Sequence, residues 1–228
     1  MFIFKKNDEI VDLKKNLRVK KPKIIPYYDE PGIYQTIGLV AYATTTFLYA
    51  VRIFDGFEIQ LVLTVWGFFI GGLAELISGL YCFKFNHYID GDTHLFFAFY
   101  WGVMSSLDIF VWVGWMVPLN EKEYGFLFLM CCFFNVLFFL HNICDKALIN
   151  ALMYSTHFLG YFFSCLGYFI EKKGVVKTGG VFFFISSFFG YYKGFAIDVN
   201  VKYKRTILPM FDKGDNLMDK VNNGIHLA

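Results

Sequence analysis

The chain has 228 residues, of which 57% are apolar, and its mean hydropathy is +0.47. A soluble domain of this size does not need so many unbroken apolar runs, so the composition excludes an ordinary soluble protein and predicts an all-α integral membrane protein. The formal net charge is only +2, and we expect no nucleic-acid partner. The five cysteines lack the spacing of a metal site, so we expect neither a metal nor a cofactor.

Residues 1–33 form a polar arm that is rich in lysine and arginine. Three prolines, Pro22, Pro26 and Pro31, prevent a long helix there. A basic segment of this kind can contact anionic membrane lipids, or it can be a solvated segment that only fixes the topology. We predict a cytosolic N-terminal arm with membrane lipids as its partners.

The first predicted transmembrane helix covers about residues 34–51 and is polar for a helix that contacts only lipid. Gln35, Tyr42 and Thr44 indicate that one side of this helix faces a pathway or another helix. Because threonine hydroxyls can bond to their own helix, simple packing remains the alternative.

The second predicted helix covers residues 59–83 and contains one ionisable group, Glu75. Gly67, Gly71, Glu75 and Gly79 recur at every fourth position, which places them on one face of a helix. Small residues let helices approach closely, so this face is predicted to pack against protein. Glu75 is a candidate proton-sensitive group, and the alternative is a hydrogen-bonded structural acid.

The remaining apolar runs predict four further helices, at about residues 94–117, 124–143, 147–170 and 175–197. A transmembrane domain over residues 34–197 would therefore contain six helices and be followed by a tail over residues 198–228. Six crossings place both termini on one side, and the terminal segments and the loops near Lys84 and Lys146 carry most of the basic residues. The positive-inside rule then predicts that both termini are cytosolic.

A few residues stand out in the later helices. The third carries a second intramembrane acid, Asp108, which is also a candidate proton-sensitive group. His157 in the fifth is either a packing residue or a substrate contact. Ser186, Gly190 and Gly194 form a second stripe of small residues in the sixth, again typical of helix packing. Before the third helix, residues 91–93 (Gly-Asp-Thr) predict a turn.

The sequence contains no phosphate-binding loop, zinc-protease motif, nucleophile elbow or dinucleotide-binding pattern. We therefore expect no enzyme and no catalytic residue. Polar groups distributed along apolar helices are instead typical of a conduit through the membrane.

Four segments resemble motifs of the acetate uptake transporter family, the acetate/succinate permeases of bacteria and yeast. They are GLVAYATTT at residues 38–46, GGLAELISGL at 71–80, GDT at 91–93 with YWG at 100–102, and RTILP at 205–209. They are similar to the family runs GLxGFxxTT, GGxAQxxAG, GNTFG…SYG and RTxLP, and they follow in the family's order. The family's NPxPLG signature before the first helix is missing, and Glu75 stands where the family has an amide.

The resemblance implies a homohexamer in which each six-helix protomer carries small monocarboxylates, either coupled to protons or as an anion channel. It also implies an apolar constriction formed by Tyr42, by Tyr100 or Trp101, and by Thr156 next to His157. A small residue on the sixth helix, Gly190 here, would influence substrate size. We expect a location in the plasma membrane. The alternative function is that of a membrane sensor or assembly protein which has lost transport.

Overall fold

The computed structural model describes residues 33–54, 60–145, 147–203 and 205–211. Residues 1–32 of the predicted basic arm and residues 212–228 of the predicted tail lie outside the described residues.

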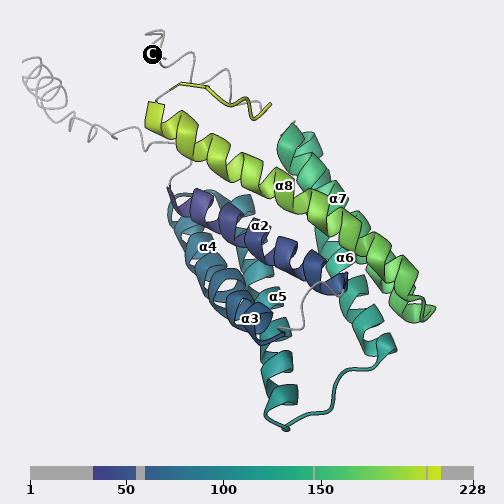
Figure 1. Ribbon diagram of the computed structural model, residues 1–228. Coiled ribbons are helices and arrows are strands. Elements are labelled where there is room, and N and C mark those ends of the chain that lie inside the picture. Colours follow the sequence, from purple (N-terminus) through teal and green to yellow (C-terminus); the bar gives the residue numbers. More distant parts are fainter. Residues whose placement is uncertain (1–32, 55–59, 146, 204, 212–228) are drawn as a thin grey trace, which may run out of the picture. The chain divides into compact units, whose positions relative to one another are not determined.

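Six helical segments cross one bundle, and the described residues contain no strand (Figure 1). This confirms the all-α membrane fold with six transmembrane helices. The second segment is continuous but has three parts, called α3, η1 and α4. The elements are α2 (Ile33–Ile53), α3 (Gln60–Trp66), η1 (Gly67–Ala74), α4 (Glu75–Lys84), α5 (Tyr88–Trp112), α6 (Glu121–Cys144), α7 (Leu148–Phe169) and α8 (Lys173–Tyr203).

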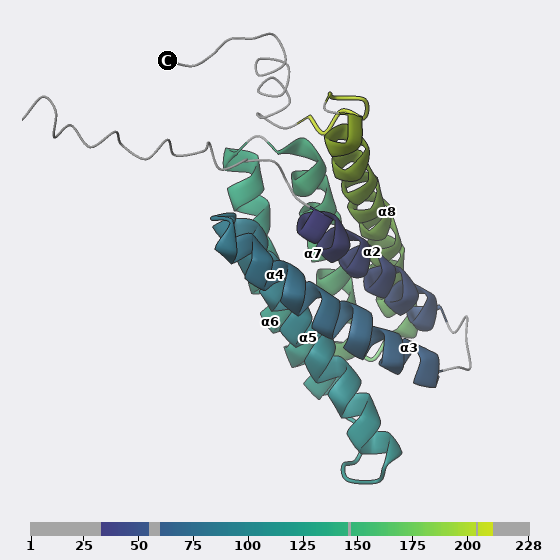
Figure 2. The same cartoon turned by 90° about the vertical axis from the view of Figure 1, so that its left-hand side faces the viewer.

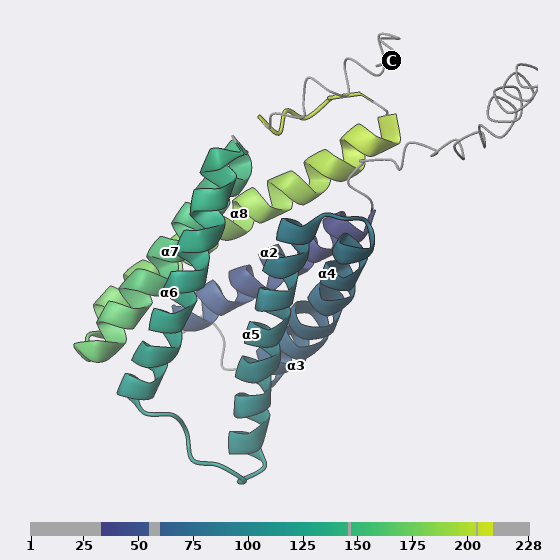
Figure 3. The same cartoon turned by 180° about the vertical axis from the view of Figure 1, so that it is seen from behind.

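Helix α2 lies in the middle of this arrangement (Figure 2). On one side it packs against α8, which packs against α7, which in turn packs against α6. On the other side it contacts η1, α4 and α5. Figure 3 shows that α4 and α6 end, and α5 and α7 begin, at the same end of the bundle. Helix α2 begins at that end and α8 finishes there, so we call it the terminal end.

Five of the described helical segments are long and apolar enough to cross a membrane. They are the segments of α2, of α3 to α4, of α5, of α6 and of α8. Helix α7 is not among them, although it has 22 residues and packs between α6 and α8. Its buried face carries Asn150, His157 and Ser164, which lower its hydropathy. The structure therefore keeps these polar side chains of α7 away from lipid by surrounding them with protein.

The small-residue stripe of the second helix coincides with a π-helix over Gly67–Ala74. Gly67, Gly71, Glu75 and Gly79 are all buried. A Cβ atom on Gly71 would lie 2.5 Å from Cγ of Trp101, and one on Gly79 would lie 3.1 Å from the main-chain oxygen of Gly91. The stripe therefore faces α5, and the glycines leave the room that the Trp101 ring occupies.

The predicted turn at residues 91–93 is wrong, because α5 already begins at Tyr88. The chain turns earlier, at Asn86, whose φ is 64°. Thr93 donates its hydroxyl hydrogen bond to the Ile89 main-chain oxygen one helical turn back, at 2.8 Å. Gly91 lies against Phe83, since a Cβ atom there would be 3.0 Å from that ring. This glycine serves close packing of α5 on α4.

Helix α8 continues past the predicted end at residue 197 to Tyr203. The RTILP segment then folds back onto it. The Asn200 side-chain oxygen accepts hydrogen bonds from the Ile207 and Leu208 main-chain nitrogens, at 2.7 and 2.9 Å. The Tyr192 hydroxyl donates to the Pro209 main-chain oxygen at 2.7 Å. The motif thus closes the terminal end of α8.

Candidate functional site

Three polar side chains from three helices meet inside the bundle. The Tyr42 hydroxyl of α2 lies 2.5 Å from Nδ1 of His157 on α7 and 2.6 Å from Oγ of Ser186 on α8. All three side chains are buried, and His157 is 1% exposed. With Phe97 of α5, whose ring centre lies 4.7 Å from that of Tyr42, they form what we call the central layer.

The hydrogen bonds of the central layer run in one direction. Ser186 donates its single hydroxyl hydrogen to the Met153 main-chain oxygen at 2.8 Å, so it accepts from Tyr42. The Tyr42 oxygen must then accept from Nδ1–H of His157. The hydrogen-bond network therefore assigns a proton to Nδ1 of His157. The layer ties α2, α7 and α8 together through these side chains.

Aromatic rings close the bundle beside the central layer. The ring centres of Tyr161 and Phe183 lie 4.7 and 5.0 Å from that of His157. Both of these residues are 1% exposed, and Tyr100 and Trp101 are buried next to them. The interior is therefore shut at this level in the structure.

The structure brings only some of the sequence-predicted constriction residues together. Tyr42 meets His157, and Gly190 lies against the Tyr42 ring. Thr156 does not join them, because its hydroxyl donates to the main-chain oxygens of Leu152 and Met153 in its own helix. The aromatic side chain of α5 in the central layer is Phe97, one turn before Trp101.

Sequence reasoning missed Phe97 because it relied on motif spacing at residues 100–102. Ser186 was expected only in helix packing, yet it hydrogen-bonds to Tyr42. Gly194, which belongs to the same predicted stripe, packs against α2. A Cβ atom placed on this glycine would lie 3.2 Å from Cγ2 of Val40.

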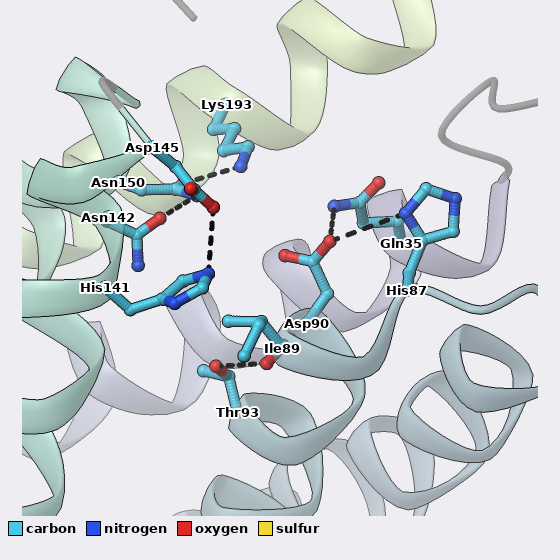
Figure 4. Close-up of polar contacts among 10 residues, drawn as sticks. All are labelled: Gln35, His87, Ile89, Asp90, Thr93, His141, Asn142, Asp145, Asn150 and Lys193. Atoms are coloured by element: carbon cyan, nitrogen blue, oxygen red, sulfur yellow. Dashed lines mark hydrogen bonds and ion pairs between the residues drawn. The ribbon is translucent and has the colours of Figure 1, made fainter.

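A second polar layer lies towards the terminal end, and we call it the outer layer. Its members are Gln35, Asp90, Asn150 and Lys193, each seven residues along its helix from a member of the central layer. Seven residues correspond to about 10 Å along a helix. Gln35 donates to the Asp90 carboxylate at 2.8 Å, and Lys193 donates to the Asn150 side-chain oxygen at 2.6 Å (Figure 4).

Glu75 begins α4 and faces α5, at the level of His94, which lies between Asp90 of the outer layer and Phe97 of the central layer. Its side chain is 0% exposed, and its Oε2 atom lies 3.5 Å from Nδ1 of His94. Neither carboxylate oxygen forms a hydrogen bond with the described residues. His94 also lies against Gly38 of α2, where its ring occupies the place that a Cβ atom would take. Glu75 is thus a buried acid beside a buried imidazole.

The second acid, Asp108, lies at the other end of the bundle in an ion pair. Arg52 holds its two carboxylate oxygens at 2.7 and 3.3 Å, and Thr64 donates to it at 3.1 Å. The two charged side chains are 27% and 22% exposed. The pair therefore joins α2 and α5 near the protein surface and neutralises both charges.

A small cavity lies between this ion pair and the aromatic rings. It offers about 20 Å³ to the centres of water molecules, which is room for about one water. Trp101 borders it, and the indole N–H of Trp101 has no acceptor among the described residues. The other residues around it include Thr45, Tyr49, Gly67 and Ser105.

Within the described ranges, no three His, Cys, Asp or Glu side chains are grouped so that they could hold a metal ion. The buried polar groups are instead arranged in layers along the helix axes. From the terminal end, the outer layer comes first and the central layer second. The aromatic rings follow, and then the cavity beside the Arg52–Asp108 pair.

Comparison with known proteins identifies the family. The GPR1/FUN34/yaaH family profile matches residues 21–211. Among solved structures, the bacterial acetate channel SatP shares the fold, with a TM-score of 0.75 at 16% sequence identity, over 78% of this chain and 98% of that chain. No curated protein matches the chain in sequence.

These matches confirm the resemblance to the acetate transporter family, and they point to a transporter or channel and not to an enzyme. Because the family profile covers most of its length, the chain belongs to the GPR1/FUN34/yaaH family.

Proposed function

We propose that this protein carries small monocarboxylates of about the size of acetate across a membrane, through the interior of each six-helix bundle. The observation that carries the proposal is the central layer, where Tyr42, His157 and Ser186 form a buried polar contact between three apolar helices. A bundle that only needed to pack would gain little from three polar side chains at its centre.

The layers on both sides support a route that continues through the central layer. The outer layer provides polar groups towards the terminal end. Towards the other end, the small cavity begins beyond the aromatic rings and reaches Arg52 and Asp108. Trp101 borders that cavity, and its buried indole N–H has no acceptor among the described residues.

The central layer serves as the gate in this proposal. Its rings close the route in the described state, so Tyr42, Phe97 and His157 must move apart for a solute to pass. A narrow apolar gate favours the neutral acid or a briefly dehydrated small anion over large charged solutes. Gly190 leaves space beside the Tyr42 ring, and the resemblance implies that a small residue at this place on the sixth helix influences substrate size.

Glu75 is the proposed proton-sensitive group. It is fully buried and within 3.5 Å of His94, so a change of its protonation alters the charge beside the route. Asp108 is the other candidate that the sequence offers. Its ion pair with Arg52 favours a fixed charge and a structural role.

We also propose a homohexamer in the plasma membrane. An apolar groove on the surface between η1 and α5 supports assembly, because Gly72, Ala98 and Gly102 along it leave room for another helix. The mass of the purified complex in detergent, measured by light scattering, tests this assembly.

Uptake by purified protein in liposomes tests the function. We expect labelled acetate to enter faster than in protein-free liposomes, and formate and lactate to compete better than succinate. Acceleration by an inward proton gradient at zero membrane potential would indicate proton coupling, whereas conductance without a gradient would indicate an anion channel. Uptake equal to that of empty liposomes for every carboxylate would favour the sensor or assembly function.

A further inference from the structure

Lys193 is a charged side chain buried inside the bundle. It belongs to α8, lies one turn beyond Gly190, and is 5% exposed. It stands in the outer layer, about 10 Å along α8 from Ser186 of the gate. In the sequence, a single lysine near the end of a long apolar run resembles an ordinary flanking residue, so Lys193 does not stand out there.

The hydrogen bonds around Lys193 form a directed chain. The Lys193 ammonium donates to Oδ1 of Asn150 at 2.6 Å, and Nδ2 of Asn150 donates to Oδ1 of Asn142 at 2.7 Å. Asn142 in turn donates to the Phe138 main-chain oxygen at 2.7 Å. The chain fixes Asn150 with its oxygen towards the ammonium. An ammonium group has three N–H donors, and this arrangement uses one of them.

The charge of Lys193 has no counter-ion among the described residues, since no carboxylate oxygen there lies within 4.0 Å of its nitrogen. The nearby acids are engaged elsewhere. Asp90 contacts Gln35 and His87, and Asp145 contacts His141. Figure 4 shows Asp90 with Gln35 and His87 apart from Lys193 and Asn150. A buried charge without a partner is unfavourable, so the site is suited to an anion.

The cation at the other end of the bundle provides a contrast. Arg52 is more exposed than Lys193, yet both of its terminal nitrogens contact the Asp108 carboxylate. Among the described residues, the cation near one surface is therefore neutralised, and the more deeply buried one contacts only an amide oxygen. Packing alone does not explain that difference, whereas a carboxylate ligand that completes the site does.

We propose that Lys193 binds the carboxylate group of a small monocarboxylate at the outer layer, and that Asn150 orients the ammonium towards it. This inference rests on the proposed function, because the ligand is the solute that then reaches the gate. One ammonium compensates one negative charge. A monocarboxylate is therefore expected to bind more tightly than a dicarboxylate, whose second charge would stay without a partner near Asp90.

Two substitutions separate ligand binding from a merely structural role. Lys193→Gln removes the charge, and its amide can still donate to Asn150, which preserves the link between α7 and α8. Asn150→Asp places a carboxylate where Lys193 already has its contact, so the protein supplies its own counter-ion. Lys202→Gln is the matched control, because Lys202 is an exposed lysine nine residues further along the same helix.

The experiment measures the thermal unfolding midpoint of full-length protein in detergent with increasing sodium acetate or sodium succinate, at ionic strength held constant with sodium chloride. We expect acetate to raise the midpoint of the wild type and of Lys202→Gln, and to raise it more than succinate does. Lys193→Gln and Asn150→Asp should lose that response. In liposomes, Lys193→Gln should raise the KM for acetate by roughly 10-fold, the effect of one lost charged hydrogen bond.

Equal acetate responses in the wild type and both variants, or no response in the wild type, would overturn the inference. Uptake that persists in Asn150→Asp together with a higher midpoint would also overturn it and assign Lys193 a bracing role. A response that depends on Lys193 in a protein without uptake would support the binding site and reject the proposed transport. If Lys193→Gln does not fold, the wild type and Asn150→Asp decide the question.

Discussion

A Cβ atom on Gly190 of α8 would lie 2.9 Å from Cδ1 of Tyr42 on α2 and 3.1 Å from Cβ of Ala43. Non-bonded carbon atoms rarely approach so closely, so the absence of a side chain at Gly190 lets the Tyr42 ring lie against α8. The same ring hydrogen-bonds to His157 and Ser186. Gly190 therefore determines where the gate residue stands.

Gly190→Ala is expected to lower acetate uptake, because the added methyl group pushes the Tyr42 ring into the route. Overpacking of this kind costs about 1–3 kcal/mol, which corresponds to roughly 5- to 150-fold in the rate of passage. Uptake by liposomes under initial-rate conditions measures it. Gly174→Ala on the same helix is the control, since a Cβ atom there has no neighbour within 4 Å. Equal losses in both variants would contradict a gate at Gly190.

Tyr42→Phe is expected to raise the acetate uptake rate by about 2- to 10-fold, because each hydrogen bond that holds the closed gate contributes about 0.5–1.5 kcal/mol. The ring remains, so the preference among carboxylates should not change. Uptake and competition by lactate and succinate measure the two effects. Tyr191→Phe is the matched control, because it removes a hydrogen bond between α8 and Thr44 of α2 outside the gate. A rate unchanged by Tyr42→Phe would show that these bonds do not hold the gate.

Glu75→Gln is expected to flatten the pH dependence of acetate uptake. The amide keeps the shape of the buried side chain beside His94 but does not exchange a proton. The profile is measured as uptake rates between pH 5 and pH 8, with the same acetate concentration for the wild type and the variants at each pH. The exposed Glu121→Gln at the start of α6 is the control and should keep the wild-type profile. An unchanged profile for Glu75→Gln would remove Glu75 from the mechanism.

Asp108→Asn is expected to destabilise the protein by about 1–3 kcal/mol. This loss of unfolding free energy lies between those expected for an exposed and for a fully buried ion pair. The reason is that both charged side chains of the Arg52–Asp108 pair are about a quarter exposed. Removing one partner leaves the other charge unpaired, so the double variant with Arg52→Gln should recover part of the loss. Unfolding by denaturant in detergent measures this double-mutant cycle. Additive losses would show that the pair contributes no coupling energy.

The sequence located the six helices well because each depends on its own apolar run. The first was expected over residues 34–51, and α2 covers Ile33–Ile53. The fifth was expected over residues 147–170, and α7 covers Leu148–Phe169. The beginning of α5 was misplaced because glycine, aspartate and threonine favour turns locally, whereas contact with Phe83 and the Thr93 hydrogen bond keep them helical here. Packing between two helices outweighed the local preference.

The sequence by itself determined the membrane fold, the number of crossings and, through its motifs, the family. These follow from apolar run lengths and short residue patterns, which are properties of neighbouring residues. Only the tertiary structure decided that Tyr42 contacts His157 and Ser186, which lie 115 and 144 positions away, and that Lys193 has an amide but no carboxylate as its described partner. Such partnerships depend on how each helix is rotated and shifted against the others, and that is fixed by the packing of all six together.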